Sequence, residues 1–241
     1  MRTRTIRAVL YDFDGTLADT TELVMECYRH TMERHLGEVP PAEEWLRGFG
    51  TPLEVQINRF ARSAAERRDM LDTYRFYQEE QAERLVRPFE GALETLDALL
   101  TRGFALAIVT SRHRESTLRG IDLCGLTDRF REIVTPEDVA SPKPHPEPVL
   151  HALKRLGVEP AEAVFVGDSP HDMAAGREAA TETAAALWGP FAREALEAER
   201  PTHLLHHPSD VLDVVGGLGA PPASRPRAGQ DSGAGVGKAG G

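Results

Sequence analysis

Cysteine, lysine and long apolar runs are scarce in this chain of 241 residues. The two cysteines, Cys27 and Cys124, are too few for a disulfide framework and lack the spacing of a metal site. We therefore expect a reducing, cytoplasmic setting. No apolar run approaches the roughly 18 residues of a membrane span, and the apolar stretch near the N-terminus is too short for a signal peptide. These absences predict a protein without a membrane partner.

An excess of basic residues is also missing. The formal net charge is −10 at pH 7, whereas a protein that binds nucleic acid usually carries a basic field. We therefore expect no nucleic-acid partner. Of the 28 basic residues 25 are arginines, and the lysines are Lys143, Lys154 and Lys238. An anionic substrate would need cations that are concentrated locally at its site.

Short apolar runs alternate with amphipathic stretches over most of the chain. The runs are apolar at nearly every position, as in parallel strands buried on both faces, and fall at residues 6–11, 104–110, 132–135, 163–167 and 183–187. Helical patterns follow at residues 92–102, 115–124, 146–156 and 172–180. This alternation predicts an α/β fold with an open parallel sheet.

Two segments depart from this alternation. Residues 18–86 carry helical patterns only, at 20–36, 42–48, 53–65 and 65–85, which predicts an inserted all-helical subdomain. Residues 216–241 contain nine of the 21 glycines and almost no large apolar side chain. Because such a segment cannot offset its ordering entropy by burial, we expect a disordered tail there.

Polar side chains follow four of the predicted strands. In chain order these are Asp12 and Asp14, then Thr110 and Ser111, then Lys143, then Asp168 and Asp172. Ligands of open α/β sheets bind at the carboxyl ends of the strands, so we expect these side chains to converge. Four neighbouring carboxylates repel one another, and a hard divalent cation such as Mg²⁺ relieves that repulsion. The sequence therefore predicts a Mg²⁺ site, with Lys143 as a further positive charge.

The segments DFDGT at 12–16, Thr-Ser at 110–111, Lys-Pro at 143–144 and GDSPHD at 167–172 resemble the motifs of the haloacid-dehalogenase-like hydrolase superfamily. This resemblance implies a Rossmann-like core of residues 1–17 and 87–215 and a helical cap of residues 18–86. It also implies a phosphoryl transfer through an aspartyl-phosphate intermediate, with a small-molecule phosphate as the substrate.

The resemblance also implies roles for the motif residues. Asp12 would be the nucleophile, and Asp14 would act first as general acid and then as general base. Lys143 would neutralise charge on the nucleophile and the phosphoryl group. The Thr110 hydroxyl and the Ser111 amide would hold the phosphoryl oxygens. Mg²⁺ would be bound by Asp12, Asp168 and the Asp14 carbonyl, with Asp172 ordering the metal's waters or Lys143.

Substrate choice depends on the cap in this family. The cap contains no lysine, which argues against a phosphonate-cleaving activity and weakens the case for a sugar-phosphate mutase. The turn GFGTP at 48–52 occupies the place of a substrate-specificity loop. We expect Arg47, Thr51 and Arg59 to contact a second anionic group there, the alternative being that the arginines are solvated helix residues.

Longer stretches resemble a branch that contains phosphoglycolate phosphatases and an inorganic pyrophosphatase. The sequence therefore predicts a Mg²⁺-dependent phosphate monoester hydrolase for a small anionic phosphate such as phosphoglycolate. An inorganic pyrophosphatase or a broad sugar-phosphate phosphatase is the alternative. A mutase and a non-catalytic regulatory protein are weaker alternatives, and no oligomeric state is predicted.

Overall fold

A single parallel sheet organises the core of the molecule. The computed structural model describes residues 5–217 of the chain. Six strands form the sheet in the order β5-β4-β1-β6-β7-β8, with every pair parallel. They are β1 (Ala8–Tyr11), β4 (Ala105–Val109), β5 (Glu132–Val134), β6 (Ala163–Gly167), β7 (Glu182–Ala186) and β8 (His203–Leu205). The predicted α/β fold is therefore confirmed.

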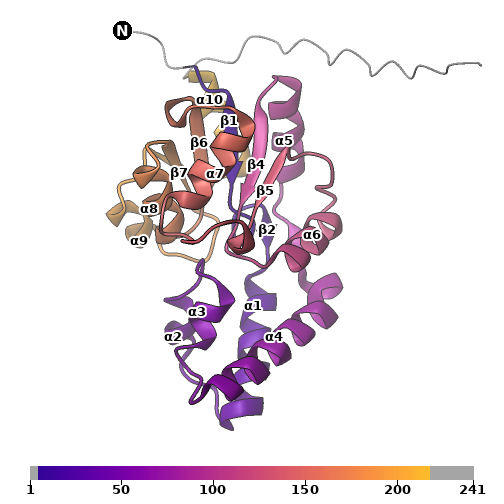
Figure 1. Ribbon diagram of the computed structural model, residues 1–241. Helices are drawn as coiled ribbons and strands as arrows, with labels where there is room; N and C mark the ends of the chain where they lie inside the picture. Colours follow the sequence, from indigo (N-terminus) through magenta and orange to yellow (C-terminus); the bar gives the residue numbers. More distant parts are fainter. Residues whose placement is uncertain (1–4, 218–241) are drawn as a thin grey trace, which may run out of the picture.

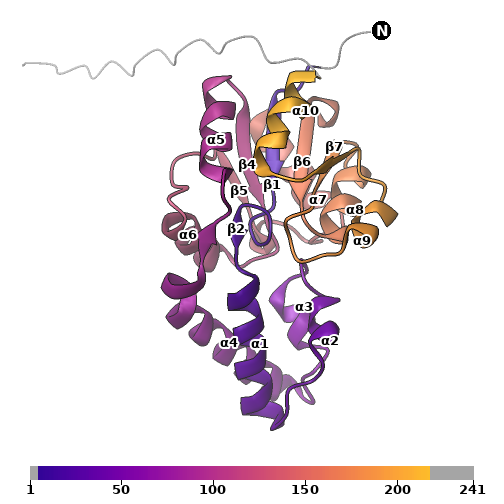
Figure 2. The same ribbon diagram turned by 180° about the vertical axis from the view of Figure 1, so that it is seen from behind.

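Helices cover both faces of this sheet. They are α5 (Ala92–Thr101), α6 (Arg114–Leu123), α7 (Glu147–Leu156), α8 (Pro170–Glu178), α9 (Arg193–Ala198) and α10 (Val211–Gly217). Ala8 and Leu10 of the central strand pack with apolar residues of α7 and α8, whereas Val9 and Tyr11 face those of α5 and α10. Figure 1 shows the first pair of helices in front of the sheet, and Figure 2 shows the second pair. Both faces are apolar because both are covered.

The helical cap lies beyond one end of the sheet (Figures 1 and 2). It consists of α1 (Thr21–Leu36), α2 (Ala42–Leu46), α3 (Leu53–Ile57) and α4 (Ala64–Leu85). Trp45 is fully buried in it and stacks on Tyr28 and Tyr74, with ring centroids 4.9 and 5.7 Å apart. Aromatic stacking thus ties α2 to the long helices α1 and α4.

Two short strands join the cap to the core. β2 (Ala18–Asp19) and β3 (Arg87–Pro88) pair antiparallel, so the chain enters and leaves the cap side by side. The predicted domain boundaries fall at the first residues of these two strands. No helix within residues 5–217 combines the length and the apolar character that crossing a bilayer requires. The expected cytoplasmic setting stays a prediction.

Several details differ from the predicted elements, among them β2, β3 and α9, which were not predicted. The helix expected over 53–65 ends at Ile57, and α4 begins after Ser63, whose hydroxyl accepts a hydrogen bond from the Glu66 amide. Strand β8 was not predicted because polar residues flank its three positions. Gly216 and Gly217 end helix α10, and the rest of the expected disordered tail lies outside the described residues.

Candidate active site

The carboxyl ends of β1, β4 and β6 bring most of the motif residues together. Asp12 follows β1 directly, Thr110 follows β4, and Asp168 follows β6. β1 is hydrogen-bonded to both β4 and β6, so these three strand ends are neighbours in the sheet. The convergence predicted from the sequence is therefore a consequence of strand order.

Lys143 links two of the buried carboxylates. Its Nζ atom lies 3.0 Å from Asp12 Oδ1 and 2.6 Å from Asp172 Oδ1, and it also donates to the Val109 carbonyl at 3.2 Å. Asp172 Oδ2 accepts hydrogen bonds from the Ser169 amide and hydroxyl at 3.0 and 2.5 Å. Both oxygens of Asp172 are thus engaged, and this residue fixes the position of the Lys143 ammonium.

Burial and charge set the pKa values of these groups. Burial, together with the negative charge of Asp172, raises the pKa of Asp12 to about 8. Burial and the charges of Asp172 and Asp12 raise the pKa of Asp168 as well. Burial alone would lower the pKa of Lys143, but the two carboxylates beside it outweigh burial and raise that pKa. The site therefore favours a bound cation, and without one the carboxyls of Asp12 and Asp168 resist ionisation.

The acidic cluster has the donors that Mg²⁺ requires. Asp12, Asp168 and Asp172 each offer a carboxylate oxygen, and these oxygens lie within 4.8 Å of one another. Asp168 Oδ1 accepts a hydrogen bond from the Thr16 hydroxyl at 2.8 Å, whereas its Oδ2 atom is buried without a partner. Buried acceptors seldom lack a partner, and oxygen ligands suit a hard cation. These residues therefore fit the metal that the sequence predicts.

Gly15 allows the first motif to approach this cluster. Its φ angle is +76°, and a Cβ atom at this position would lie 2.4 Å from Asp168 Oδ2. Any other residue would be strained in backbone and would overlap the carboxylate. The fold therefore requires glycine at this position of the first motif.

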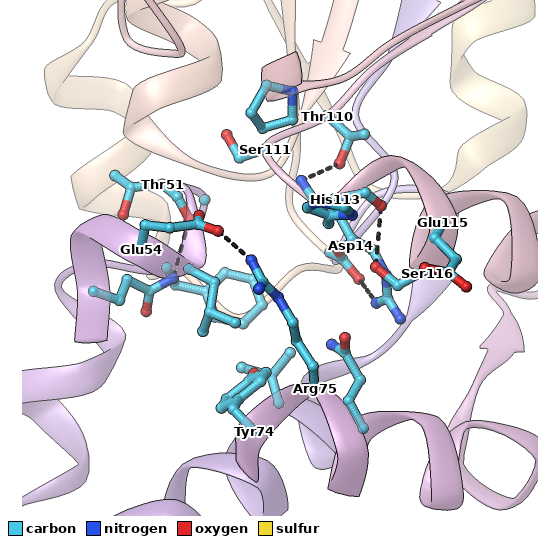
Figure 3. A pocket seen from close by; sticks show the side chains of 18 of the residues that line it. Asp14, Thr51, Glu54, Tyr74, Arg75, Thr110, Ser111, His113, Glu115 and Ser116 are labelled. Carbon is cyan, nitrogen blue, oxygen red and sulfur yellow. Dashed lines mark hydrogen bonds and ion pairs between the residues drawn. The ribbon is translucent and has the colours of Figure 1, made fainter. Parts of the chain in front are cut away.

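A pocket of about 340 Å³ opens in front of Asp12, between the core and the cap. From the core it is lined by Asp12, Asp14, Thr110 and Ser111, and from the cap by Thr51, Glu54, Tyr74 and Arg75, among others. Figure 3 shows Asp14, Thr110 and Ser111 across the cavity from Glu54, Tyr74 and Arg75. The volume suits a small ligand.

Arg112 holds the predicted general acid. Its Nη1 atom donates to Asp14 Oδ1 at 2.8 Å, and its side chain is 6% exposed. Its backbone amide donates to Thr110 Oγ1 at 3.1 Å, which leaves the hydroxyl hydrogen of Thr110 available to a ligand. The sequence analysis missed Arg112, although its place directly after Ser111 is a signal that could have found it.

The cap residues predicted to bind substrate separate into two groups. Thr51 lines the pocket, and its hydroxyl donates to the Gly48 carbonyl at 2.6 Å. Arg47 and Arg59 are not among the lining residues. Arg47 folds back on its own helix and donates to the Glu43 carbonyl, and the Arg59 guanidinium lies against the Phe60 ring. The cap arginine that does line the pocket is Arg75, for which the sequence offers no motif.

Comparison with known proteins agrees with this geometry. The sequence model of the haloacid dehalogenase-like hydrolases matches residues 9–186. Pyrophosphatase PpaX of Bacillus pumilus is 41% identical over 216 residues, which are 90% of this chain and 99% of that protein. Pyrophosphatase PpaX of Bacillus velezensis is 39% identical over 217 residues, with the same two coverages.

Solved structures share the fold. A predicted phosphoglycolate phosphatase from Haemophilus somnus superposes with a TM-score of 0.80 at 20% identity, over 87% of this chain and 97% of that one. A haloacid dehalogenase-like hydrolase from Streptococcus pneumoniae gives a TM-score of 0.74 at 25% identity, over 87% of this chain and 98% of that one. The chain belongs to the haloacid dehalogenase-like hydrolase family and is an enzyme of the phosphatase or pyrophosphatase kind.

Proposed function

We propose that the protein is a Mg²⁺-dependent hydrolase for a small phosphate that carries a second anionic group, with inorganic pyrophosphate as the first candidate. The observation that carries this proposal is a set of buried polar atoms without partners. Ser111 Oγ and the Nε atoms of Arg112 and Arg75 belong to pocket-lining residues, and Asp168 Oδ2 belongs to the acidic cluster. Buried polar groups in native proteins are nearly always paired, so these atoms are available to a ligand or metal at this site.

The metal would be held by Asp12, Asp168 and the Asp14 carbonyl. When bound, Mg²⁺ would supply positive charge that offsets the repulsion between the substrate phosphate and the carboxylates. Asp172 would act beside it by holding Lys143, because both of its own oxygens already accept hydrogen bonds.

The first half-reaction uses two carboxyl groups. Asp12 Oδ2 attacks phosphorus, since Oδ1 is occupied by Lys143 and by the Phe13 amide at 2.7 Å. The bond from phosphorus to the leaving oxygen breaks, and Asp14 gives that oxygen a proton. Thr110 and Ser111 hold the phosphoryl oxygens, and Lys143 offsets the charge that develops on them.

The second half-reaction returns the enzyme to its starting state. Asp14, now ionised, takes a proton from a water molecule whose oxygen attacks the phosphorus of the Asp12 acyl phosphate. The bond between phosphorus and the Asp12 oxygen breaks, which releases orthophosphate and restores the carboxylate. Arg112 keeps the Asp14 carboxyl in one orientation through both steps.

Two considerations favour pyrophosphate among the small phosphates that carry a second anionic group. The relatives that match nearly the whole chain at about 40% identity are named pyrophosphatases. Pyrophosphate also places two phosphoryl groups across a short span, which suits a pocket with donors on its core side and a guanidinium on its cap side. Phosphoglycolate, the first expectation from the sequence, carries a carboxylate in the corresponding place and is the second candidate.

A substrate panel tests the proposal. Release of orthophosphate is measured from pyrophosphate, phosphoglycolate, a hexose phosphate and p-nitrophenyl phosphate, with Mg²⁺ and with a chelator. We expect kcat/KM to be highest for pyrophosphate, and all activity to vanish with the chelator and in Asp12→Asn. A higher value for the hexose phosphate, or full activity without metal, would contradict the proposal.

A further inference from the structure

Arg75 and Glu54 face each other at the cap side of the pocket. Arg75 lies on α4, Glu54 on α3, and Arg75 Nη2 pairs with Glu54 Oε1 (Figure 3). Their side chains are 39% and 42% exposed, so water reaches both partners. Arg75 Nε is nevertheless buried and has no partner. The guanidinium is thus only partly satisfied, and it opens into the same cavity as Asp12 and Asp14.

Each of the other two arginines that line the pocket already pairs with a carboxylate through an Nη atom. Arg112 is bound to Asp14 at 2.8 Å, and Arg119 pairs with Glu83 at 3.0 Å. Arg75 differs from both. Among the described residues, it is the lining arginine that pairs with a carboxylate on the cap wall of the same pocket, that of Glu54. A carboxylate in that position has the same charge and the same planar hydrogen-bonding geometry as the anionic end of a small ligand.

We propose that Arg75 binds the non-reacting anionic group of the substrate, and that Glu54 is an internal counter-ion which this group displaces. The inference rests on the proposed function, since it concerns the substrate of the same pocket. An exposed ion pair contributes little net stability, whereas a guanidinium gains more from a phosphate that can use both Nη2 and the unpartnered Nε. A phosphate with a neutral leaving group cannot displace Glu54 and loses this contact.

The ordinary alternative is that the pair only fastens α3 to α4. In that case the loss of either partner would disturb the pocket for every ligand alike. Displacement makes two opposite predictions instead. Removal of Arg75 weakens only the binding of ligands with two anionic groups, and removal of Glu54 strengthens the binding of those ligands. The two variants therefore separate a binding role from a structural one.

Calorimetry with unreactive ligands tests the inference without turnover. Methylenediphosphonate carries two anionic groups and methylphosphonate carries one; each is titrated into the protein with excess Mg²⁺. We expect Arg75→Gln to weaken methylenediphosphonate binding more than tenfold and methylphosphonate binding less than threefold. We expect Glu54→Gln to strengthen methylenediphosphonate binding at least threefold.

Two matched controls accompany these variants. Glu79 lines the same pocket, so Glu79→Gln removes the same charge but leaves the Arg75 partner in place. We expect Glu79→Gln to strengthen methylenediphosphonate binding clearly less than Glu54→Gln does. Arg68 lies exposed on α4 outside the pocket lining, and we expect no change in Arg68→Gln.

Several results would overturn the inference. Equal weakening of both ligands in Arg75→Gln would show a structural role, and equal gains in Glu54→Gln and Glu79→Gln would show a charge effect without displacement. If Arg75→Gln does not fold, Arg75→Lys and Glu54→Gln decide the question, because lysine keeps the charge without the planar fork. A wild-type protein that hydrolyses no phosphate but still distinguishes the two ligands through Arg75 would refute the proposed function alone.

Discussion

Arg112 shows how one buried side chain orders the proposed general acid beside it. Its side chain is 6% exposed, and its guanidinium contacts Asp14 and lies 5.9 Å from the centre of the Phe13 ring. A charge-assisted hydrogen bond of this kind contributes about 1.5–3 kcal/mol. In the proposed mechanism Asp14 delivers a proton along one direction, so the orientation that Arg112 imposes matters most when the leaving oxygen is basic.

Arg112→Gln should therefore slow the hydrolysis of pyrophosphate and alkyl phosphates by roughly 10- to 100-fold in kcat. Hydrolysis of p-nitrophenyl phosphate should slow much less, because its leaving group needs little proton donation. The measurement is kcat for each substrate, with Asp14→Asn as the reference for complete loss of the acid. Equal losses for all substrates would mean that Arg112 acts on the pocket as a whole.

The residues of the core motifs could be located from the sequence, but Arg75 could not. Asp12, Thr110 and Asp168 each follow a strand directly, and parallel strands fix where their ends lie. Arg75 is one of four arginines on α4, and its neighbours in sequence give it no distinction. Which of the four meets the pocket depends on how α4 packs on the rest of the cap, and local pattern does not determine that packing.

At the scale of elements, the turn between α2 and α3 is a point where the cap packs against the core. Gly50 has a φ angle of +85°, and a Cβ atom there would lie 2.8 Å from Ser169 Oγ. The preceding residue, Phe49, packs edge-on against Phe191 of the core with ring centroids 6.3 Å apart. The turn therefore rests on the loop that also orients Asp172, which couples cap position to the active site.

Gly50→Ala should lower kcat/KM roughly tenfold, because the new methyl group pushes the turn off Ser169 and misplaces the cap side of the pocket. Gly37→Ala is the matched control, since its φ angle is +76° but nothing lies within 4 Å of the added carbon. Both variants should lose about 1–2 kcal/mol of stability from left-handed backbone strain. If Gly37→Ala loses as much activity as Gly50→Ala, backbone strain alone explains the effect.

Sequence pattern predicts some of the elements and misses others. The strands at 105–109 and 163–167 could be predicted because every position is apolar and buried. The break between α3 and α4 could not, because helical periodicity continues across residues 58–63, and the Ser63 cap is visible only once the turn is formed. The short edge strand β8 could not be predicted either, because it begins with His203 and polar residues flank it on both sides.

For the whole molecule, the acidic cluster links metal binding, pH and stability. The pKa of Asp12 rises from 3.8 to about 8 on folding, and the pKa of Asp168 rises as well. Between pH 3.8 and about pH 8, these two carboxyls therefore hold more protons in the folded, metal-free protein than in the unfolded chain. Stability changes with pH in proportion to the protons bound by the unfolded state minus those bound by the folded state, so it falls as pH rises through this window.

Thermal melting in a chelator should therefore give a midpoint that falls from pH 5 to pH 8. Added Mg²⁺ binds the ionised carboxylates, so the increase in Tm that it causes should grow over the same range. Asp168→Asn removes one of the two raised groups and should flatten both trends, which separates this cluster from the other acids of a chain with net charge −10. A chelated protein whose midpoint rises between pH 5 and 8, or a Mg²⁺ effect of constant size, would mean that Asp12 and Asp168 are already ionised without metal. Lys143 alone would then balance the repulsion between these carboxylates in the metal-free protein, and metal binding would not be linked to their protonation.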